Sequence, residues 1–573
     1  MKNIKNKYLL IPLFVFIGLS VLFSSINYIE NEGFNPTDEG VILSQSWRII
    51  NGEIAHTDFI SIRPVASAYL HSLNFVIPGS VVENARIFVL FQYFIIALVM
   101  SIMCFRTLER INKKKYHFTY FFALLIAGLT VTILNYNLYS WTTIDAVFWS
   151  VIALPLIFSK NKWKIAVGLL LTSLAALSRQ TFAVITLSGF LYVVYQNRRE
   201  FVKFIPVFII GALPFLAYFI MLMSSNGLSE FISQMTGRTE FFQTAILQFA
   251  KKFILGMTSA LNTACLFICA LLYFKRKSAF RKMFITKGYH SLISIIYLFF
   301  TIVITVRHFI LPEVDIYSLP FDLFFMTVFF TVFHYLLNPD NLALRKISVA
   351  SLIIAWTSSI SLGDNSPVFA AGILLISLTI MCFDVILSYP STLTKPITNK
   401  YLLITLSIII FGFGLYSQPR VNYRDTASDE YVTGLGLASE EFGDIRTNRH
   451  VVAYYNELSD IFYGLDNAIN NTVVFPNNAM FYTAMKTRNP APVDWLSPYE
   501  YIGQESRIIR DLNNVIKTQK TYFIVDKIDI RVIKNGIKPL NYSKDIVFDF
   551  IIANCDISEI DSDFFTVYIS KAL

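Results

Sequence analysis

The stretch NPTDEGVILSQSWRIINGEIAHTDFISIRPV, residues 35–65, follows the first long apolar run of the chain and begins with two adjacent acids, Asp38 and Glu39. Pro36 and Thr37 precede the acids, and this order favours a helix start because carboxylates near a helix N-terminus complement the helix dipole. The acidic pair therefore either completes a helix end or supplies the chemical centre of the protein.

The residues after the acidic pair mix apolar and polar side chains along the expected helix. This amphipathic pattern predicts a helix that lies in the membrane–water interface, with Trp47 at the depth of the lipid headgroups. Asn51 and Gly52 are expected to end the helix, because both residue types favour turns.

The composition of the whole chain indicates a membrane protein, since 55% of its 573 residues are hydrophobic and only 15% are charged. The apolar residues occur in runs long enough to cross about 30 Å of hydrocarbon as helices. The sequence therefore predicts an α-helical polytopic membrane protein with about 13 transmembrane helices. The predicted spans are approximately residues 8–28, 87–105, 118–135, 142–158, 163–178, 181–195, 202–223, 253–274, 289–306, 318–337, 347–362, 367–388 and 401–416.

The Lys and Arg residues predict the orientation of these spans. With the N-terminus in the cytoplasm, the inner connections hold 24 Lys and Arg, whereas the outer connections before residue 417 hold 8. Cytoplasmic loops of membrane proteins carry such an excess. An odd number of spans then places the C-terminal tail outside, and the short spans favour a bacterial inner (plasma) membrane. The pI near 9.0 reflects the inner loops, so no nucleic-acid partner is expected.

Two domains are expected. A transmembrane domain covers residues 1–416 and has a long first outer loop at about 29–86, and an extracytoplasmic (periplasmic) α/β domain covers residues 417–573. In this tail, NTVVFP, KTYFIVDK and DSDFFTVYIS have the pattern of strands, while HVVAYYNELSDIFYGLDNAIN and ESRIIRDLNNVIKTQ have that of helices. The tail is long enough for a core of its own. The five Cys are scattered, which predicts neither a disulfide framework nor a zinc site.

Asp38 has two interpretations on its residue pattern alone. One is that its charge only complements the helix dipole. The other is that it is a general base, because a partly desolvated carboxylate at the membrane surface can take a proton from an acceptor hydroxyl or amine as that group attacks.

The first outer loop resembles that of GT-C membrane glycosyltransferases, and most of all the protein O-mannosyltransferases and the aminoarabinose transferase that modifies lipid A. Their pattern is Asp-Glu, a Gly ahead of an Asp, a basic residue before Pro-Pro, and then Tyr. The matching positions are Asp38-Glu39, Gly52, Asp58, Arg63-Pro64 and Tyr69. The chain departs from the pattern in lacking the aromatic residue soon after Asp-Glu and in having Val65 for the second Pro.

This resemblance implies a GT-C-like fold and an inverting glycosyltransferase. Its donor is a polyprenyl-phosphate-linked sugar, and its acceptor is an extracytoplasmic glycan, lipid or protein. Asp38 is then the base, Glu39 supports it or binds the acceptor, and Asp58 and Tyr69 are supporting residues. Because the lipid phosphate is the leaving group, cationic side chains are expected to hold it. Arg63 is the first candidate, and its alternative is an Arg that only extends its charge to the membrane interface.

Further candidates lie at the expected outer ends of spans. Arg179, Arg238 and Arg307 either bind the donor phosphate or only set topology and form ion pairs. Asp145 either pairs with an Arg above it or contacts a sugar hydroxyl, and His308 is a further supporting residue. No cofactor is predicted, although His56 with Asp58, and His308 with acids that follow it, leave a divalent metal open.

Two other functions fit a membrane protein with an outer domain. O-antigen polymerases and ligases carry their large outer loop late in the chain, so the early position of Asp38 argues against them. A lipid-linked glycan transporter or flippase would show broken Gly- and Pro-rich spans at matching positions of two halves, and the sequence has no such pairing.

Overall fold

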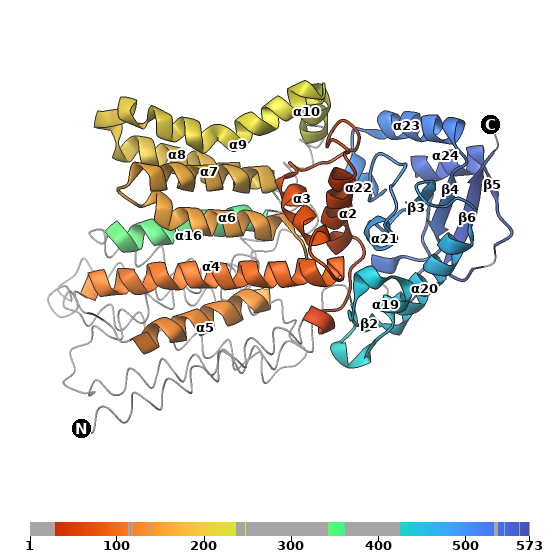
Figure 1. The fold of residues 1–573 in the computed structure, drawn as a ribbon, viewed down its shortest axis with the longest axis horizontal. Helices are drawn as coiled ribbons and strands as arrows, with labels where there is room; N and C mark the ends of the chain where they lie inside the picture. The colour runs from red at the N-terminus through yellow and green to blue at the C-terminus, as the bar shows by residue number, and fades with distance from the viewer. Residues whose placement is uncertain are drawn as a thin grey trace.

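The computed structural model describes residues 29–112, 115, 118–135, 137–236, 247, 342–360, 425–531, 537–543, 545–560 and 562–571. The described part contains a bundle of long helices, a set of short helices at one end of that bundle, and a mixed α/β tail beyond them (Figure 1). The short helices therefore lie between the bundle and the tail.

The long helices run side by side in Figure 1. Two apolar stretches, Val81–Thr107 and Arg198–Ser224, have the length and hydropathy needed to cross a membrane. Each predicted span that falls in the described part coincides with a helix, whereas the total of about 13 stays a prediction. The helices are α4 (Val81–Asn112), α5 (Phe118–Asn135), α6 (Thr142–Ile157), α7 (Lys162–Ser178), α8 (Ala183–Gln196), α9 (Ile205–Ser224) and α16 (Leu342–Ser359).

Small residues let the bundle helices approach one another closely. A Cβ atom added at Gly168 of α7 would lie 2.8 Å from Ile157 of α6, and one added at Gly211 of α9 would lie 2.6 Å from Leu169 of α7. Ser173 of α7 also donates a hydrogen bond of 2.7 Å to the carbonyl of Gly211. Backbone approach at small residues and interhelical hydrogen bonds are the usual means by which helices pack in membranes.

Short elements connect the bundle to the tail or lie at the ends of its helices. Among them, α2 carries the acidic pair of the first outer loop. The elements are α2 (Asp38–Ile50), α3 (Ala66–His71), η1 (Ser72–Phe75), η2 (Gln180–Phe182), η3 (Arg198–Phe204) and α10 (Leu228–Thr236).

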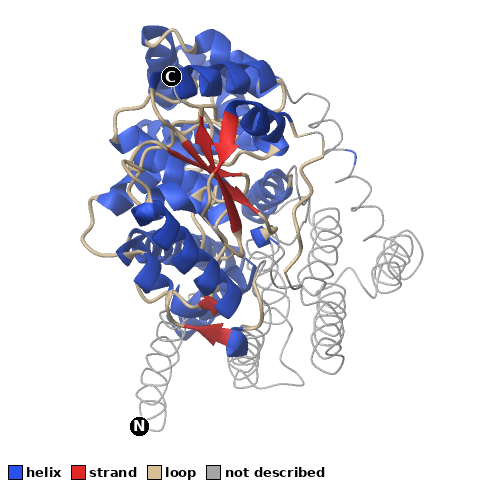
Figure 2. Cartoon of the chain, turned by 90° about the vertical axis from the view of Figure 1, so that its right-hand side faces the viewer, coloured by secondary structure: helices blue, strands red, loops and turns tan. Residues whose placement is uncertain are grey.

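The tail contains a four-stranded sheet of order β3-β4-β6-β5, flanked by helices (Figure 2). Strands β3 (Thr472–Phe475) and β4 (Tyr522–Asp526) are parallel, so both end at the same edge, whereas β6 (Phe565–Ser570) is antiparallel to β4 and to β5 (Cys555–Ile557). The remaining elements are η5 (Ser428–Glu430), β1 (Tyr431–Val432), α19 (Leu435–Ala438), η6 (Glu440–Phe442), β2 (Thr447–Asn448), α20 (Arg449–Gly464), α21 (Met480–Ala484), α22 (Pro498–Tyr501), α23 (Glu505–Thr518) and α24 (Ile546–Asn554).

The strands and helices that the sequence predicts in the tail are present, but the core is shared with the first outer loop and the bundle. One cluster of buried side chains joins Leu43 of α2 and Val82 of α4 to Tyr454 and Phe481 of the tail. The tail also caps the start of α4, because the Glu441 carboxylate accepts a hydrogen bond of 3.2 Å from the backbone N–H of Val81. Burial of these apolar surfaces fixes the tail on the end of the bundle.

Candidate functional site

Helix α2 begins at Asp38 and ends at Ile50, as the sequence predicts. The side-chain oxygen of Asn35 accepts hydrogen bonds from the backbone N–H groups of Thr37 (3.1 Å) and Asp38 (3.2 Å), so it satisfies donors that the helix leaves unpaired. The Asn35 amide also donates to the Asp38 carboxylate at 3.3 Å. Asp38 keeps partial contact with solvent, whereas Glu39 beside it is fully buried.

Glu39 forms a buried, bidentate ion pair with Arg86 of α4. The guanidinium donates to the two carboxylate oxygens at 2.8 and 2.9 Å. Nη1 donates to the carbonyl of Ile29 at 2.7 Å, and Nη2, which also bonds Glu39, donates to the carbonyl of Gly33 at 2.6 Å, so one side chain connects the start of the outer loop to the first turn of α2. Burial raises the pKa of Glu39, and the positive charge of Arg86 opposes that rise.

The tail holds the opposite side of the same helix start. The backbone N–H of Met480 donates to the carbonyl of Pro36 at 3.0 Å, and Ser44 donates to the carbonyl of Ala479 at 2.9 Å. Gly40 is required at this crossing, because a Cβ atom there would lie 2.3 Å from the Met480 nitrogen. Asp38 therefore belongs to a helix turn that the bundle and the tail fix from two sides.

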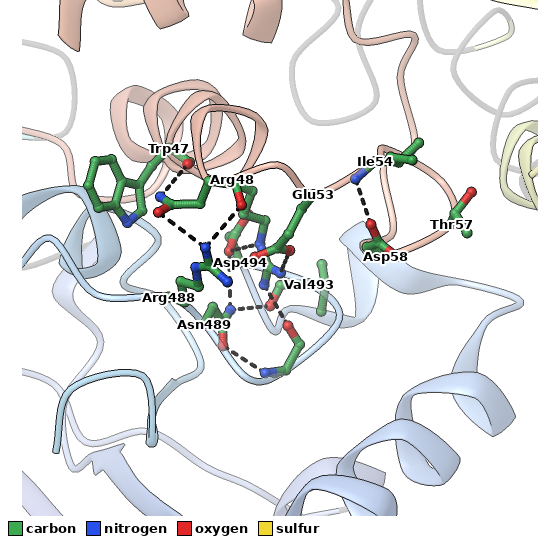
Figure 3. Close-up of polar contacts among 12 residues, drawn as sticks. Trp47, Arg48, Glu53, Ile54, Thr57, Asp58, Arg488, Asn489, Val493 and Asp494 are labelled. Atoms are coloured by element: carbon green, nitrogen blue, oxygen red, sulfur yellow. Dashed lines mark hydrogen bonds and ion pairs between the residues drawn. The ribbon is translucent and has the colours of Figure 1, made fainter. Parts of the chain in front are cut away.

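The second half of α2 also binds the tail (Figure 3). Arg48 is buried, pairs with Asp494 of the tail at 2.8 Å and with Glu53 at 2.6 Å, and donates to the carbonyl of Ala491. The Trp47 indole donates to the carbonyl of Thr487 at 3.1 Å. The polar face of α2 is therefore covered by tail groups that satisfy its hydrogen-bonding side chains, while the depth of the helix relative to the membrane interface stays a prediction.

His56 anchors the loop that follows α2. Its side chain is buried, with Nδ1 2.7 Å from the Gln234 carbonyl oxygen and Nε2 2.6 Å from the Tyr218 hydroxyl. Its φ of +69° lies in the left-handed region, which is strained for a residue other than Gly. Burial lowers the pKa of His56 to about 4, and Arg507 of the tail adds to that effect. Because the partners occupy both ring nitrogens, the neutral ring has a structural role in this loop.

Asp58 and Arg63 lie further along the same loop but do not contact each other. Asp58 is exposed and accepts a hydrogen bond of 2.7 Å from the backbone N–H of Ile54, so it holds the turn. Arg63 keeps 31% of its side chain exposed and pairs with Glu500 of the tail at 3.4 Å. A partly exposed guanidinium at this distance from one carboxylate retains donors that can meet another anion.

Arg179 lies close to this loop, since its neighbour Gln180 donates to the carbonyl of Ile62 at 3.2 Å. The Arg179 guanidinium donates to the carbonyl of Ile360 at 2.5 Å, at the end of α16. The structure thus brings the segments that carry Arg63 and Arg179 together. Tyr69 of α3 is 43% exposed, and its hydroxyl contacts the sulfur of Met221 at 3.3 Å.

Asp145 is buried in the first turn of α6, and its hydrogen-bond partners in the described part of the chain are His71 and Gln92 rather than an Arg. Its Oδ1 atom lies 3.2 Å from His71 Nε2 and accepts a hydrogen bond of 2.8 Å from the Gln92 amide. The Asn74 amide in turn donates to His71 Nδ1 at 3.0 Å. This polar cluster joins α3, η1, α4 and α6 at the end of the bundle near the tail.

Sequence reasoning missed several residues that shape this site. Arg86 carried the signal of an ionisable side chain next to a predicted span, whereas His71 lies within the first outer loop and carried no such signal. Glu500, Asp494 and Arg507 carried none, since acidic and basic residues in a polar tail are common and only the fold sets them against the first outer loop.

Three of the predicted site residues, Arg238, Arg307 and His308, lie outside the described residues. Within the described part, no group of three or more His, Cys, Asp or Glu side chains is placed to hold a metal ion. Of the pair considered for a metal, His56 contacts Gln234 and Tyr218, and Asp58 accepts a hydrogen bond from the backbone of Ile54.

Comparison with known proteins adds little to this geometry. No protein-family model matches the sequence, and no curated protein matches it. Among solved structures, the crystal structure of ArnT from Cupriavidus metallidurans bound to undecaprenyl phosphate aligns over 98% of this chain and 98% of that chain, at 11% sequence identity and a TM-score of 0.34. A likeness at this level assigns neither a fold nor a function.

Proposed function

We propose that this protein is an inverting glycosyltransferase of GT-C type. It transfers a sugar from a polyprenyl-phosphate-linked donor to an extracytoplasmic glycan, lipid or protein, in the inner membrane of a bacterium. The observation that carries the proposal is the position of Asp38, a partly exposed carboxylate at the first residue of α2, in a turn that the bundle and the tail hold rigidly. A base must be held in this way to act on an incoming nucleophile.

The reaction is a single displacement at the anomeric carbon of the sugar. Asp38 takes the proton of the acceptor hydroxyl, and the acceptor oxygen forms a bond to the anomeric carbon. The bond between that carbon and the phosphate oxygen breaks, and the lipid phosphate leaves with the electron pair. Attack from the face opposite the leaving group inverts the configuration at this carbon.

Arg63 and Arg179 hold the donor phosphate in this proposal. The hydrogen bond from Gln180 to the carbonyl of Ile62 supports the pairing, because it connects the residue after Arg179 to the residue before Arg63. Cationic donors at this position bind the phosphate more strongly as negative charge develops on it during the reaction. Arg238 and Arg307, in segments outside the described residues, are further candidates for the same role.

The other predicted residues act by position. Glu39 supports Asp38 through its ion pair with Arg86, and Asp58 holds the turn that leads to Arg63. Tyr69 and Asp145 lie on elements next to this loop, and His308 is a supporting candidate from the sequence. The tail closes over the site, since Glu500 and Arg507 contact the loop that carries the phosphate-binding residue.

The test is sugar transfer by Asp38→Asn in proteoliposomes that contain a polyprenyl-phosphate-linked donor. Loss of a general base lowers kcat by about 10²- to 10⁴-fold, while donor binding is retained because the phosphate contacts are unchanged. Asp460→Asn is the matched control, since Asp460 is an exposed carboxylate on α20 of the tail. Turnover of Asp38→Asn at the rate of the unaltered protein would exclude this mechanism.

A second variant separates donor binding from proton transfer. Arg63→Ala is expected both to raise the KM for the donor and to lower kcat, because its contact with the phosphate is made before the reaction and strengthens during it, whereas Asp38→Asn should lower kcat alone. If neither variant nor the unaltered protein transfers sugar, but labelled lipid-linked glycan crosses the bilayer, the protein is a transporter instead.

A further inference from the structure

Asp526 is a buried acid that the proposed reaction does not use. It is the last residue of β4, at the edge where the parallel strands β3 and β4 both end. Its Oδ1 atom accepts a hydrogen bond of 2.6 Å from the Tyr454 hydroxyl of α20. Its Oδ2 atom is buried and has no hydrogen-bond partner among the described residues. Burying a charge in such a place is costly, whereas the uncharged acid is tolerated.

A chain of hydrogen bonds leads from Asp526 to α2. The Asn478 amide donates to the Tyr454 hydroxyl at 3.2 Å, and the Asn478 oxygen accepts from Tyr455 at 2.6 Å. Asn478 lies in the segment after β3, and two residues later Met480 donates to the carbonyl of Pro36. The same segment therefore connects the interior of the tail with the turn that carries the candidate base.

Every residue in this series of hydrogen bonds is buried, so solvent can do little to compensate for a displacement at one end of it. The side chains of Tyr454, Tyr455 and Asn478 are fully buried. The Phe34 ring packs edge-on against Tyr455 at 5.4 Å, which adds a second contact to the segment just before α2. Buried polar networks in which every link has one geometry transmit small displacements.

We propose that Asp526 is a positioning residue, which holds Asp38 in place through Tyr454 and Asn478, and that its ionisation disturbs this hold because the buried Oδ2 atom then carries charge without a partner among the described residues. This inference rests on the proposed function for its effect on catalysis. Its structural part, that the charge of Asp526 controls how firmly the tail grips the start of α2, stands independently and can be measured without any substrate.

The electrostatic surroundings of Asp526 agree with this assignment. Burial raises its pKa to about 8, although hydrogen bonds from Tyr454 and from the Asn477 backbone oppose the rise. The neighbouring Asp529 raises the pKa further and Arg531 lowers it. Because this folded-state pKa lies above the ordinary value of 3.8, the folded tail keeps a proton that the unfolded chain has released, and its stability falls as the pH rises toward 8.

Other ionisable groups also face the cluster. The Tyr542 hydroxyl donates to the backbone carbonyl of Asp526, and burial raises the pKa values of Tyr454, Tyr455 and Tyr542 above their ordinary value. These phenols therefore stay protonated across the range in which Asp526 titrates. Asp526 is then the group of this cluster with a pKa of about 8.

The catalytic test compares pH profiles of kcat for sugar transfer. The unaltered protein should lose about tenfold in kcat between pH 7 and pH 9, because the uncharged form falls to about one tenth at one pH unit above a pKa of 8. Asp526→Asn, which keeps an acceptor for Tyr454 but cannot ionise, should retain its rate to pH 9. Tyr454→Phe should lower kcat several-fold at every pH without changing the KM for the donor.

Asp556→Asn is the matched control, because Asp556 is an exposed carboxylate on β5 of the same sheet. It should keep the pH profile of the unaltered protein. A profile for Asp526→Asn that still falls between pH 7 and pH 9 would overturn the proposal, as would a Tyr454→Phe variant with unchanged kcat.

Amide hydrogen exchange tests the structural part without substrate. Peptides that cover residues 36–44 should lose protection above pH 8 in the unaltered protein and in Asp556→Asn, relative to Asp526→Asn at the same pH. Equal protection in all three proteins at pH 9 would refute the coupling. If the protection changes as expected but no protein transfers sugar, the proposed function fails while the coupling stands.

Discussion

The ion pair between Glu39 and Arg86 offers a sharp test of how the helix that carries Asp38 is held. Both side chains are fully buried, and two hydrogen bonds of 2.8 and 2.9 Å join them. The perturbation is Arg86→Met, which leaves a shorter, unbranched apolar side chain and removes the charge. It leaves the Glu39 carboxylate, and the carbonyls of Ile29 and Gly33, without their donor.

The expected loss of stability is large because a buried polar group cannot replace a lost hydrogen bond with one to water. Removing one member of a buried ion pair costs about 3–5 kcal/mol, and a buried carbonyl left unpaired costs about 1–3 kcal/mol. Glu39 lowers its share by taking up a proton, since burial already raises its pKa and Arg86 no longer opposes that rise. We expect a net loss of about 3–5 kcal/mol at neutral pH, and a smaller one in acid.

The sign of this pH dependence follows from the direction of the pKa shift. A carboxyl whose folded-state pKa lies above its unfolded value stabilises the fold at low pH, and that contribution is lost as the pH rises. Arg86→Met should therefore lose stability between pH 5 and pH 8 more steeply than the unaltered protein. The assay is the free energy of unfolding in mixed detergent micelles at both pH values.

The double variant Glu39→Leu with Arg86→Met separates charge from the other contacts. Replacing both members of a buried ion pair by apolar groups is often neutral, so the double variant should recover part of the loss. Recovery is incomplete, because the carbonyls of Ile29 and Gly33 still lack a donor. A single variant as stable as the unaltered protein, or a double variant no better than Arg86→Met, would refute the reasoning.

Two further predictions concern the contacts around the same helix. His56 has a folded-state pKa of about 4, below its ordinary 6.5, so its contribution to stability is complete above pH 6.5 and is lost as the pH falls to 4. Over this range we expect His56 alone to account for a loss of about 3 kcal/mol in the free energy of unfolding. In thermal melts, the stability of His56→Asn should therefore fall less steeply between pH 6.5 and pH 4 than that of the unaltered protein. Gly40→Ala should push α2 away from Met480 and lower the free energy of unfolding by about 1–3 kcal/mol, as measured by thermal melts. The same variant should also lower the rate of sugar transfer. Gly464→Ala is its control, because nothing lies within 4 Å of a Cβ atom there, and an equal loss in both variants would contradict the packing argument.

Local patterns were enough to place the elements. The apolar runs fall on the helices of the bundle, and the start and end of α2 follow from Asp38 and from Asn51-Gly52. Strands β3, β4 and β6 also lie where their alternating or buried patterns predict them. These features depend on residues close together in the chain, which periodicity and turn chemistry report directly.

Contacts between distant segments could not be derived in this way. The amphipathic face of α2 has the same pattern whether it meets lipid headgroups or protein, and only the fold shows Thr487 and Asp494 against it. Asp145 was expected at the outer end of a span, but the sequence gives no reason to prefer His71 and Gln92 as its partners.

The sequence by itself determined the apolar helices, the strands of the tail and the place of the acidic pair at a helix start. Only the tertiary structure decided that the two adjacent acids differ, with Asp38 partly exposed and Glu39 buried against Arg86. The physical reason is that successive residues on a helix point about 100° apart, so neighbours in sequence meet different surroundings. Which surroundings they meet depends on how the bundle and the tail pack around the helix.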